Sequence, residues 1–106
     1  IWKVAQAAAR TAHDILELRE TLRVRITDEF PNSLIGIRFL DALLESPVIW
    51  VSRVADHLGV SFPTANNLVR AFSTLGILRE MTGQSRNRLF VFSDYLDLME
   101  SGLDIL

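Results

Sequence analysis

The chain has 106 residues, 49% of them hydrophobic, which suits one small domain with a modest core. It contains no cysteine, which excludes disulfides, thiolate metal sites and cysteine nucleophiles and makes a reducing, cytoplasmic compartment the default expectation. Its 11 basic residues against 13 acidic ones argue against the broad electropositive surface that dominates nucleic-acid affinity.

Residues 1–32 predict one long amphipathic helix. Apolar residues recur three and four positions apart from Ala5 to Ile26 without an internal Gly or Pro, and Pro31 ends the run. The stripe consists of Ala5, Ala8, Ala9, Ala12, Ile15, Leu16, Leu22 and Ile26. A helix this long exceeds what so small a domain can bury, so it either packs on other parts of a longer chain or pairs with another copy. The absence of an initiator Met also suggests a fragment of a longer protein.

Residues 33–106 predict a second unit, which opens with three helices. These helices cover about 33–45, 51–58 and 61–75, and the apolar residues 48–50 fit a short strand. Gly59 and Gly76 are placed to end the second and third helices, and Ser61 is placed to cap the third. No apolar run approaches the ~20 residues needed to span a bilayer, so no membrane partner is expected.

A β-hairpin and a last helix follow the three helices. Residues 77–82 and 88–92 are rich in β-branched and aromatic side chains and predict two strands, which the polar tip 83–87 separates. Ser93 opens a final helix that ends near Gly102. The predicted fold class is therefore mainly α with a small β-hairpin, a winged helix-turn-helix preceded by a long N-terminal helix.

The spacing around Gly59 is typical of a helix-turn-helix. Ala55 lies in the centre of the first helix, where a small side chain lets the second helix cross closely. Gly59 follows four residues later, where the turn favours a positive φ. The side chains expected to pack the two helices together are Val54, Leu58, Val60, Ala65 and Leu68.

The candidate site is a nucleic-acid interface on the helix after Ser61 and on the hairpin. Asn can pair with adenine edges, and Arg can pair with guanine or phosphate. The candidate residues are Ser61, Thr64, Asn66, Asn67 and Arg70 on the helix, and Gln84, Ser85, Arg86, Asn87 and Arg88 in the wing. The low net charge supports an alternative equally well, in which these are ordinary solvated helix and turn residues.

The residues do not predict a catalytic centre. His13 and His57 are far apart in sequence and are expected on the surface, so no metal, catalytic or cofactor-binding residue is assigned, and no small-molecule ligand is predicted. Trp2 and Trp50 could mark an interaction surface, but Trp50 abuts the predicted short strand and is expected in core or lid packing.

Several segments resemble the C-terminal winged-helix region of Fic-family proteins. The resemblance is carried by Asp56–Asn66, Leu75–Gly83, Arg86–Phe92 and Tyr95–Leu98, and it extends over about 34–102. Members of that family transfer AMP from ATP to a hydroxyl of a target protein through a His-containing, Gly- and Arg-rich loop. This chain has no such loop, so the resemblance implies a non-catalytic appendage of an AMP-transferring parent.

These observations predict two segments and two functions. Residues 1–32 are expected to be the tail of a preceding Fic catalytic domain, and residues 33–106 the winged helix-turn-helix domain. The predicted function is a regulatory, DNA-binding-like module, with DNA as partner. The alternative is a protein-interaction or dimerisation domain that uses the N-terminal helix and does not bind DNA.

Overall fold

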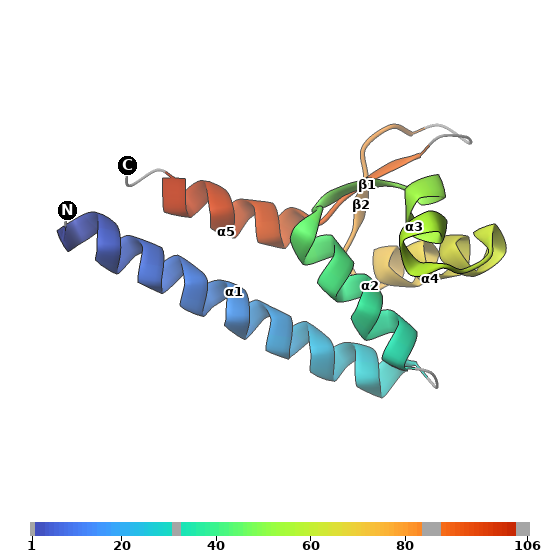
Figure 1. Cartoon of the computed structure of the whole chain (residues 1–106), viewed down its shortest axis with the longest axis horizontal. Coiled ribbons are helices and arrows are strands. Elements are labelled where there is room, and N and C mark those ends of the chain that lie inside the picture. Colours follow the sequence, from blue (N-terminus) through green and yellow to red (C-terminus); the bar gives the residue numbers. More distant parts are fainter. Residues whose placement is uncertain (1, 31–32, 84–87, 104–106) are drawn as a thin grey trace.

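The computed structural model describes residues 2–30, 33–83 and 88–103 (Figure 1). In chain order its elements are α1 (Trp2–Glu29), α2 (Ser33–Glu45), β1 (Val48–Trp50), α3 (Val51–Leu58), α4 (Phe62–Thr74), β2 (Arg79–Glu80), β3 (Leu89–Val91) and α5 (Ser93–Leu103). Helix α1 runs along one side of the molecule with α5 beside it, and α2 leads from this pair to the sheet, α3 and α4. The predicted fold class is confirmed: a mainly α winged helix-turn-helix preceded by a long N-terminal helix.

The small sheet has three strands, because the short strand β1 joins the predicted hairpin. The strand order is β1-β3-β2, both pairs are antiparallel, and Val48 lies opposite Val91. Side chains alternate between the two faces of a strand, so buried Ile49 places Trp50 on the other side of the sheet. Trp50 is 42% exposed, so it does not pack in the core, and the core half of the core-or-lid prediction is wrong.

The two hairpin strands are shorter than predicted. Ile77 and Leu78 belong to the predicted first strand, but their backbone N–H groups donate to the carbonyl of Phe72 at 2.9 and 3.3 Å. These bonds close the C-terminal end of α4, so the two residues are not available to the β2–β3 ladder. Both side chains are nevertheless buried in the core.

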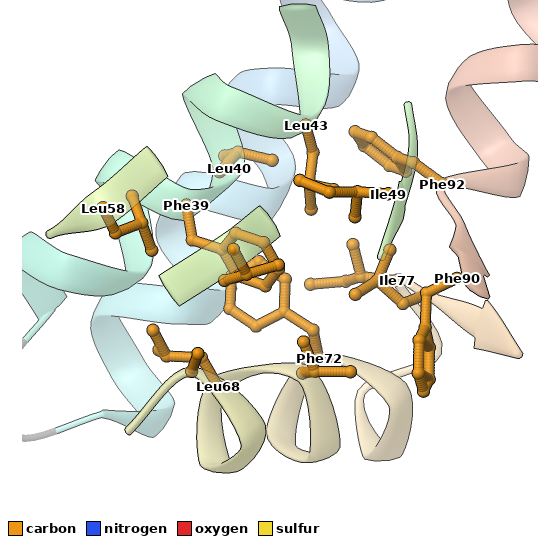
Figure 2. Close-up of a cluster of buried hydrophobic side chains, with 14 of the residues drawn as sticks. Phe39, Leu40, Leu43, Ile49, Leu58, Leu68, Phe72, Ile77, Phe90 and Phe92 are labelled. Atoms are coloured by element: carbon orange, nitrogen blue, oxygen red, sulfur yellow. The ribbon is translucent and has the colours of Figure 1, made fainter. Parts of the chain in front are cut away.

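One hydrophobic core joins α1 to the rest of the chain. Figure 2 shows side chains from α2, α3, α4 and the sheet converging, with the Phe39 and Phe72 ring centroids 4.6 Å apart. Leu22 and Ile26 of α1 belong to the same cluster. The boundary predicted after residue 32 stays a prediction, but the segments on its two sides share this core.

Helix α1 packs with only part of the predicted stripe, namely Ile15, Leu22 and Ile26. A Cβ atom on Gly102 of α5 would lie 2.7 Å from the Thr11 hydroxyl oxygen, so α1 and α5 approach closely at Thr11. The partly or fully buried line follows from there through Ile15, Leu18, Leu22 and Ile26. Five members of the predicted stripe are exposed instead, and we call them the alanine stripe: Ala5, Ala8, Ala9, Ala12 and Leu16.

A bidentate ion pair links α1 to α2. The guanidinium of Arg19 donates to both carboxylate oxygens of Asp41, at 2.9 and 3.2 Å, and this hydrogen bonding raises the pKa of Arg19. Two parallel N–H···O bonds fix the orientation of the groups more tightly than one point contact would.

None of the helices in the described part of the chain has a stretch long and apolar enough to cross a bilayer.

Candidate nucleic-acid interface

The turn between α3 and α4 has the predicted geometry. Gly59 adopts φ 66° and ψ 35°, the left-handed conformation that glycine reaches without a Cβ penalty. The backbone N–H of Val60 donates to the carbonyl of Ala55 at 3.1 Å and closes α3. Ala55 itself is partly buried and packs against the core. The sequence spacing therefore identified a helix-turn-helix correctly.

Helix α4 has one buried face and one polar exposed face. Ala65, Leu68, Val69 and Phe72 are buried. On the opposite side of the helix, Pro63 and the residues four, seven and eleven positions after it form a line. We call this line, which is exposed throughout, the α4 stripe: Pro63, Asn67, Arg70 and Thr74. Two of the candidate residues, Asn67 and Arg70, therefore point away from the core.

Ser61 and Thr64 lie exposed at the N-terminus of α4, where they form its cap. The Ser61 hydroxyl oxygen accepts a hydrogen bond from the Thr64 backbone N–H at 3.3 Å and donates to the Thr64 hydroxyl at 2.9 Å. An N-cap of this kind satisfies a backbone donor that the first helical turn leaves unpaired. The structure thus gives both residues a local structural role.

Asn66 and Arg88 come together from α4 and the base of the wing. The guanidinium of Arg88 donates to the side-chain oxygen of Asn66 at 2.6 Å, and both residues are partly buried. This differs from the expectation that Asn66 faces outward, because the side of α4 that carries Asn66 is turned toward the wing. The candidate residues Gln84, Ser85 and Arg86, with Asn87, lie outside the described residues.

Two arginines from α1 and α2 hold the ends of the helix-turn-helix. Arg25 donates to the carbonyl of Leu75 at 2.8 Å, and Arg38 donates to the carbonyl of Leu58 at 3.3 Å. These carbonyls lie at the C-terminal ends of α4 and α3, where the helix dipole favours a positive charge. The two guanidinium groups therefore serve internal contacts that the sequence did not reveal.

The remaining positive charge near the helix-turn-helix is sparse. Among the described arginines of residues 33–103, Arg53, Arg70 and Arg79 are exposed, and their guanidinium groups make no hydrogen bond or ion pair with another described group. Arg70 is the one of these three on the α4 stripe. Direct pairing with a polyanion at this helix would therefore depend on Arg70.

Phe62 is a surface residue of the site that sequence reasoning did not assign. It is 56% exposed in the first turn of α4, directly after the capping Ser61. An apolar side chain at such a position can contact a thymine methyl group in a major groove. Its place three residues before buried Ala65 matches the packing period, so the pattern alone would assign it to the core.

The histidines belong to no metal-ligand cluster among the described residues. His13 and His57 are both exposed, as predicted, and the His13 ring nitrogen lies 3.6 Å from a Glu17 carboxylate oxygen. No group of three His, Asp or Glu side chains converges anywhere in the described ranges.

The fold is shared with solved structures, although no protein-family model matches the chain and no curated protein is similar to it. The transcriptional regulator Tm0710 from Thermotoga maritima aligns with a TM-score of 0.53 and 16% identity over 93% of this chain and 72% of its own. RV1404 from Mycobacterium tuberculosis aligns with a TM-score of 0.54 and 18% identity over 96% of this chain and 71% of its own. Coverage this high includes most of α1, so the long helix belongs to the shared fold.

These comparisons overturn the predicted Fic-family resemblance. The structural similarity lies with a transcriptional regulator, and nothing in it points to an AMP-transferring parent or to a Fic domain before residue 33. The residues that carried the resemblance have local structural roles: Gly59 and Gly76 adopt positive φ, Ser61 caps α4 and Phe90 is buried. Such positions recur wherever a winged helix-turn-helix needs them, so they do not identify a family.

Proposed function

We propose that this chain is a DNA-binding winged-helix module of a regulatory protein, with α4 as its recognition helix. The observation that carries the proposal is the α4 stripe, which presents Asn67 and Arg70 opposite the buried face of the helix. A recognition helix lies in the major groove and must show polar side chains on the face turned away from its own domain. The structural similarity to a transcriptional regulator supports this assignment.

The chemistry of the α4 stripe suits base edges. An Asn amide can donate to and accept from adenine N7 and N6, and an Arg guanidinium can donate to guanine O6 and N7. Both side chains are exposed, so neither has to leave the core in order to bind. Asn67 and Arg70 lie three positions apart and are therefore neighbours on the helix surface.

The charge of the chain sets the expected strength of binding. A net charge of −2 gives little long-range attraction to DNA. Each phosphate contact contributes about −0.9 to the slope of log K against log salt concentration. We therefore expect a slope of roughly −2 to −3 from the few exposed arginines, and binding that is measurable only at low salt.

Fluorescence anisotropy tests the proposal, with duplexes first selected from a randomised library by the wild-type chain. Arg70→Ala and Asn67→Ala are each expected to weaken binding about tenfold or more, because a good bidentate base contact is worth roughly 1–3 kcal/mol. Arg10→Ala is the matched control, since Arg10 is exposed in the N-terminal half of α1. The N-terminal end of α1 lies away from α4 (Figure 1). Binding that both α4 substitutions leave unchanged, or no binding below the high-micromolar range at low salt, would contradict the proposal.

A second candidate function, self-association through α1, is favoured by the alanine stripe. Its five apolar side chains are exposed along one side of the helix, and Leu16 is 66% exposed. Small side chains let two helix backbones approach closely, so the stripe suits a second copy of α1.

Sedimentation equilibrium tests self-association. Ala12→Glu would place a charge in the centre of the alanine stripe and is expected to weaken a dimer at least tenfold, because an unpaired carboxylate is costly to bury. Thr21→Glu, at an exposed position of the same helix outside the alanine stripe, is expected to leave the association constant unchanged. A wild-type chain that is monomeric at the highest measurable concentration would exclude this role.

A further inference from the structure

We propose that Asn66, Arg88 and Glu80 form a latch that fixes the base of the wing, strands β2 and β3, against α4, and that Asn66 and Arg88 position these strands rather than contact DNA. The consequence for DNA rests on the proposed function, but the latch itself does not. We use the name wing latch for these three residues.

Arg88 connects three elements at the base of the wing. Its guanidinium donates to the Asn66 side-chain oxygen on α4 at 2.6 Å, and another of its nitrogens lies 3.9 Å from a Glu80 carboxylate oxygen on β2. The guanidinium carbon lies 5.3 Å from the centroid of the Phe90 ring on β3, in cation–π range. Arg88 and Glu80 side chains are each only 30% exposed.

This arrangement leaves Arg88 poorly suited to bind a phosphate. The carboxylate of Glu80 already lies close to its positive charge, and the bond to Asn66 occupies one end of its planar donor fork. Asn66 is equally constrained, because reading adenine requires its amide oxygen and nitrogen together. That oxygen already accepts the Arg88 bond, and the residue is partly buried.

The wing needs such support because its own ladder is very short. Strand β2 has two residues and β3 has three, and β2 is an edge strand of the three-stranded sheet, so few backbone bonds hold it. One backbone bond, from Met81 N–H to the Leu89 carbonyl at 2.9 Å, extends the pairing. The Thr82 hydroxyl continues the side-chain network, since it donates to Glu80 at 3.3 Å and accepts from Leu89 N–H at 3.4 Å.

Amide hydrogen exchange of the DNA-free chain tests the latch directly. Asn66→Ala is expected to speed exchange at the Met81 and Leu89 N–H groups roughly tenfold to a hundredfold, the range for loss of a hydrogen bond to a charged group. Ile77 N–H, which bonds to the end of α4, should keep its wild-type rate, which separates local opening of the wing from global unfolding.

Two variants make the exchange test specific. Asn66→Asp keeps an acceptor for Arg88 and is expected to retain wild-type protection at Met81 and Leu89. Asn67→Ala removes the same type of side chain from the exposed neighbouring position and should leave wing exchange unchanged, although it weakens DNA binding. Equal exchange rates in Asn66→Ala and Asn67→Ala would overturn the latch.

DNA binding then distinguishes a positioning role from a phosphate contact. Under the latch, Asn66→Ala and Arg88→Ala each weaken binding, the double variant is no weaker than Arg88→Ala alone, and the salt slope keeps its wild-type value. Glu80→Gln should not tighten binding. A slope reduced by about 0.9 in Arg88→Ala, together with tighter binding by Glu80→Gln, would instead assign Arg88 to a phosphate and overturn the proposal.

The two proposals fail separately in these experiments. If the wild-type chain binds no duplex, the proposed function fails while the exchange result still decides the latch. If the chain binds DNA but wing exchange does not respond to Asn66→Ala, the latch fails and the recognition helix stands.

Discussion

Phe72→Ala is expected to lower the free energy of unfolding by about 3–5 kcal/mol. The Phe72 side chain is fully buried, and its ring lies 4.6 Å from the Phe39 ring centroid and 6.2 Å from that of Phe30. Truncation removes apolar burial and leaves a cavity where α4 meets α2. Figure 2 shows the Phe72 and Phe39 side chains that meet there. Urea denaturation followed by circular dichroism measures the loss.

Two variants calibrate the Phe72 experiment. Phe72→Leu retains most of the buried volume and is expected to cost clearly less than the alanine variant. Thr74→Ala, at an exposed position on the same helix, should stay within about 0.5 kcal/mol of wild type. A loss below about 1 kcal/mol in Phe72→Ala would show that α4 does not depend on this contact, against the range typical of buried aromatic residues.

Gly36→Ala is expected to destabilise the chain by about 1–3 kcal/mol, although alanine is the better helix former. A Cβ atom at Gly36 would lie 2.7 Å from the Cγ2 methyl of Ile26, far inside van der Waals contact. Ile26 is fully buried and β-branched, so its methyl cannot rotate away easily. The overlap therefore outweighs the helix-propensity gain of roughly 1 kcal/mol.

A double-mutant cycle identifies the cause of the Gly36 effect. In an Ile26→Ala background the offending methyl is absent, so Gly36→Ala is expected to become neutral or stabilising. Denaturant midpoints of the four proteins give the coupling free energy. Additive effects, or a stabilising Gly36→Ala in the wild-type background, would mean that α1 and α2 are not held at this separation.

The charge balance argued against a broad electropositive surface, and the contacts of the arginines show how few positive charges are available. Arg19, Arg25, Arg38 and Arg88 are all engaged within the described structure, by a carboxylate, a helix C-terminus or the wing latch. The cation available on the α4 stripe is Arg70. The proposed DNA interface would therefore rely on a few short-range contacts, which is why Arg70→Ala is its most direct test.

Only part of the candidate site could be predicted from the sequence. The exposed positions of Asn67 and Arg70 follow from the helical period of the buried residues on α4, which is local information. The pairing of Asn66 with Arg88 joins residues 22 positions apart, and it depends on how the wing folds back against α4. The spacing of residues within a single helix or strand therefore could not predict that contact.

The resemblance to Fic-family proteins shows that the sequence alone also did not identify the family. Its matching segments contain the caps, turns and core positions that this architecture requires, as Gly59 and Ser61 illustrate. Residues that a fold demands for steric reasons carry little information about the parent protein. The structural similarity to a transcriptional regulator corrected the assignment.

The amino-acid sequence alone determined the helices and the turns of this protein, because their causes are local. Gly59 permits a left-handed turn, Ser61 satisfies a free N–H group, and apolar spacing defines each helix. Tertiary packing decided the length of the strands, the exposure of Trp50, the choice of face on α1 and the partners of the arginines. Those features depend on which segments meet in space. The arginines pair with backbone carbonyls and carboxylates that are distant in the sequence, and no periodic pattern of residues predicts such pairs.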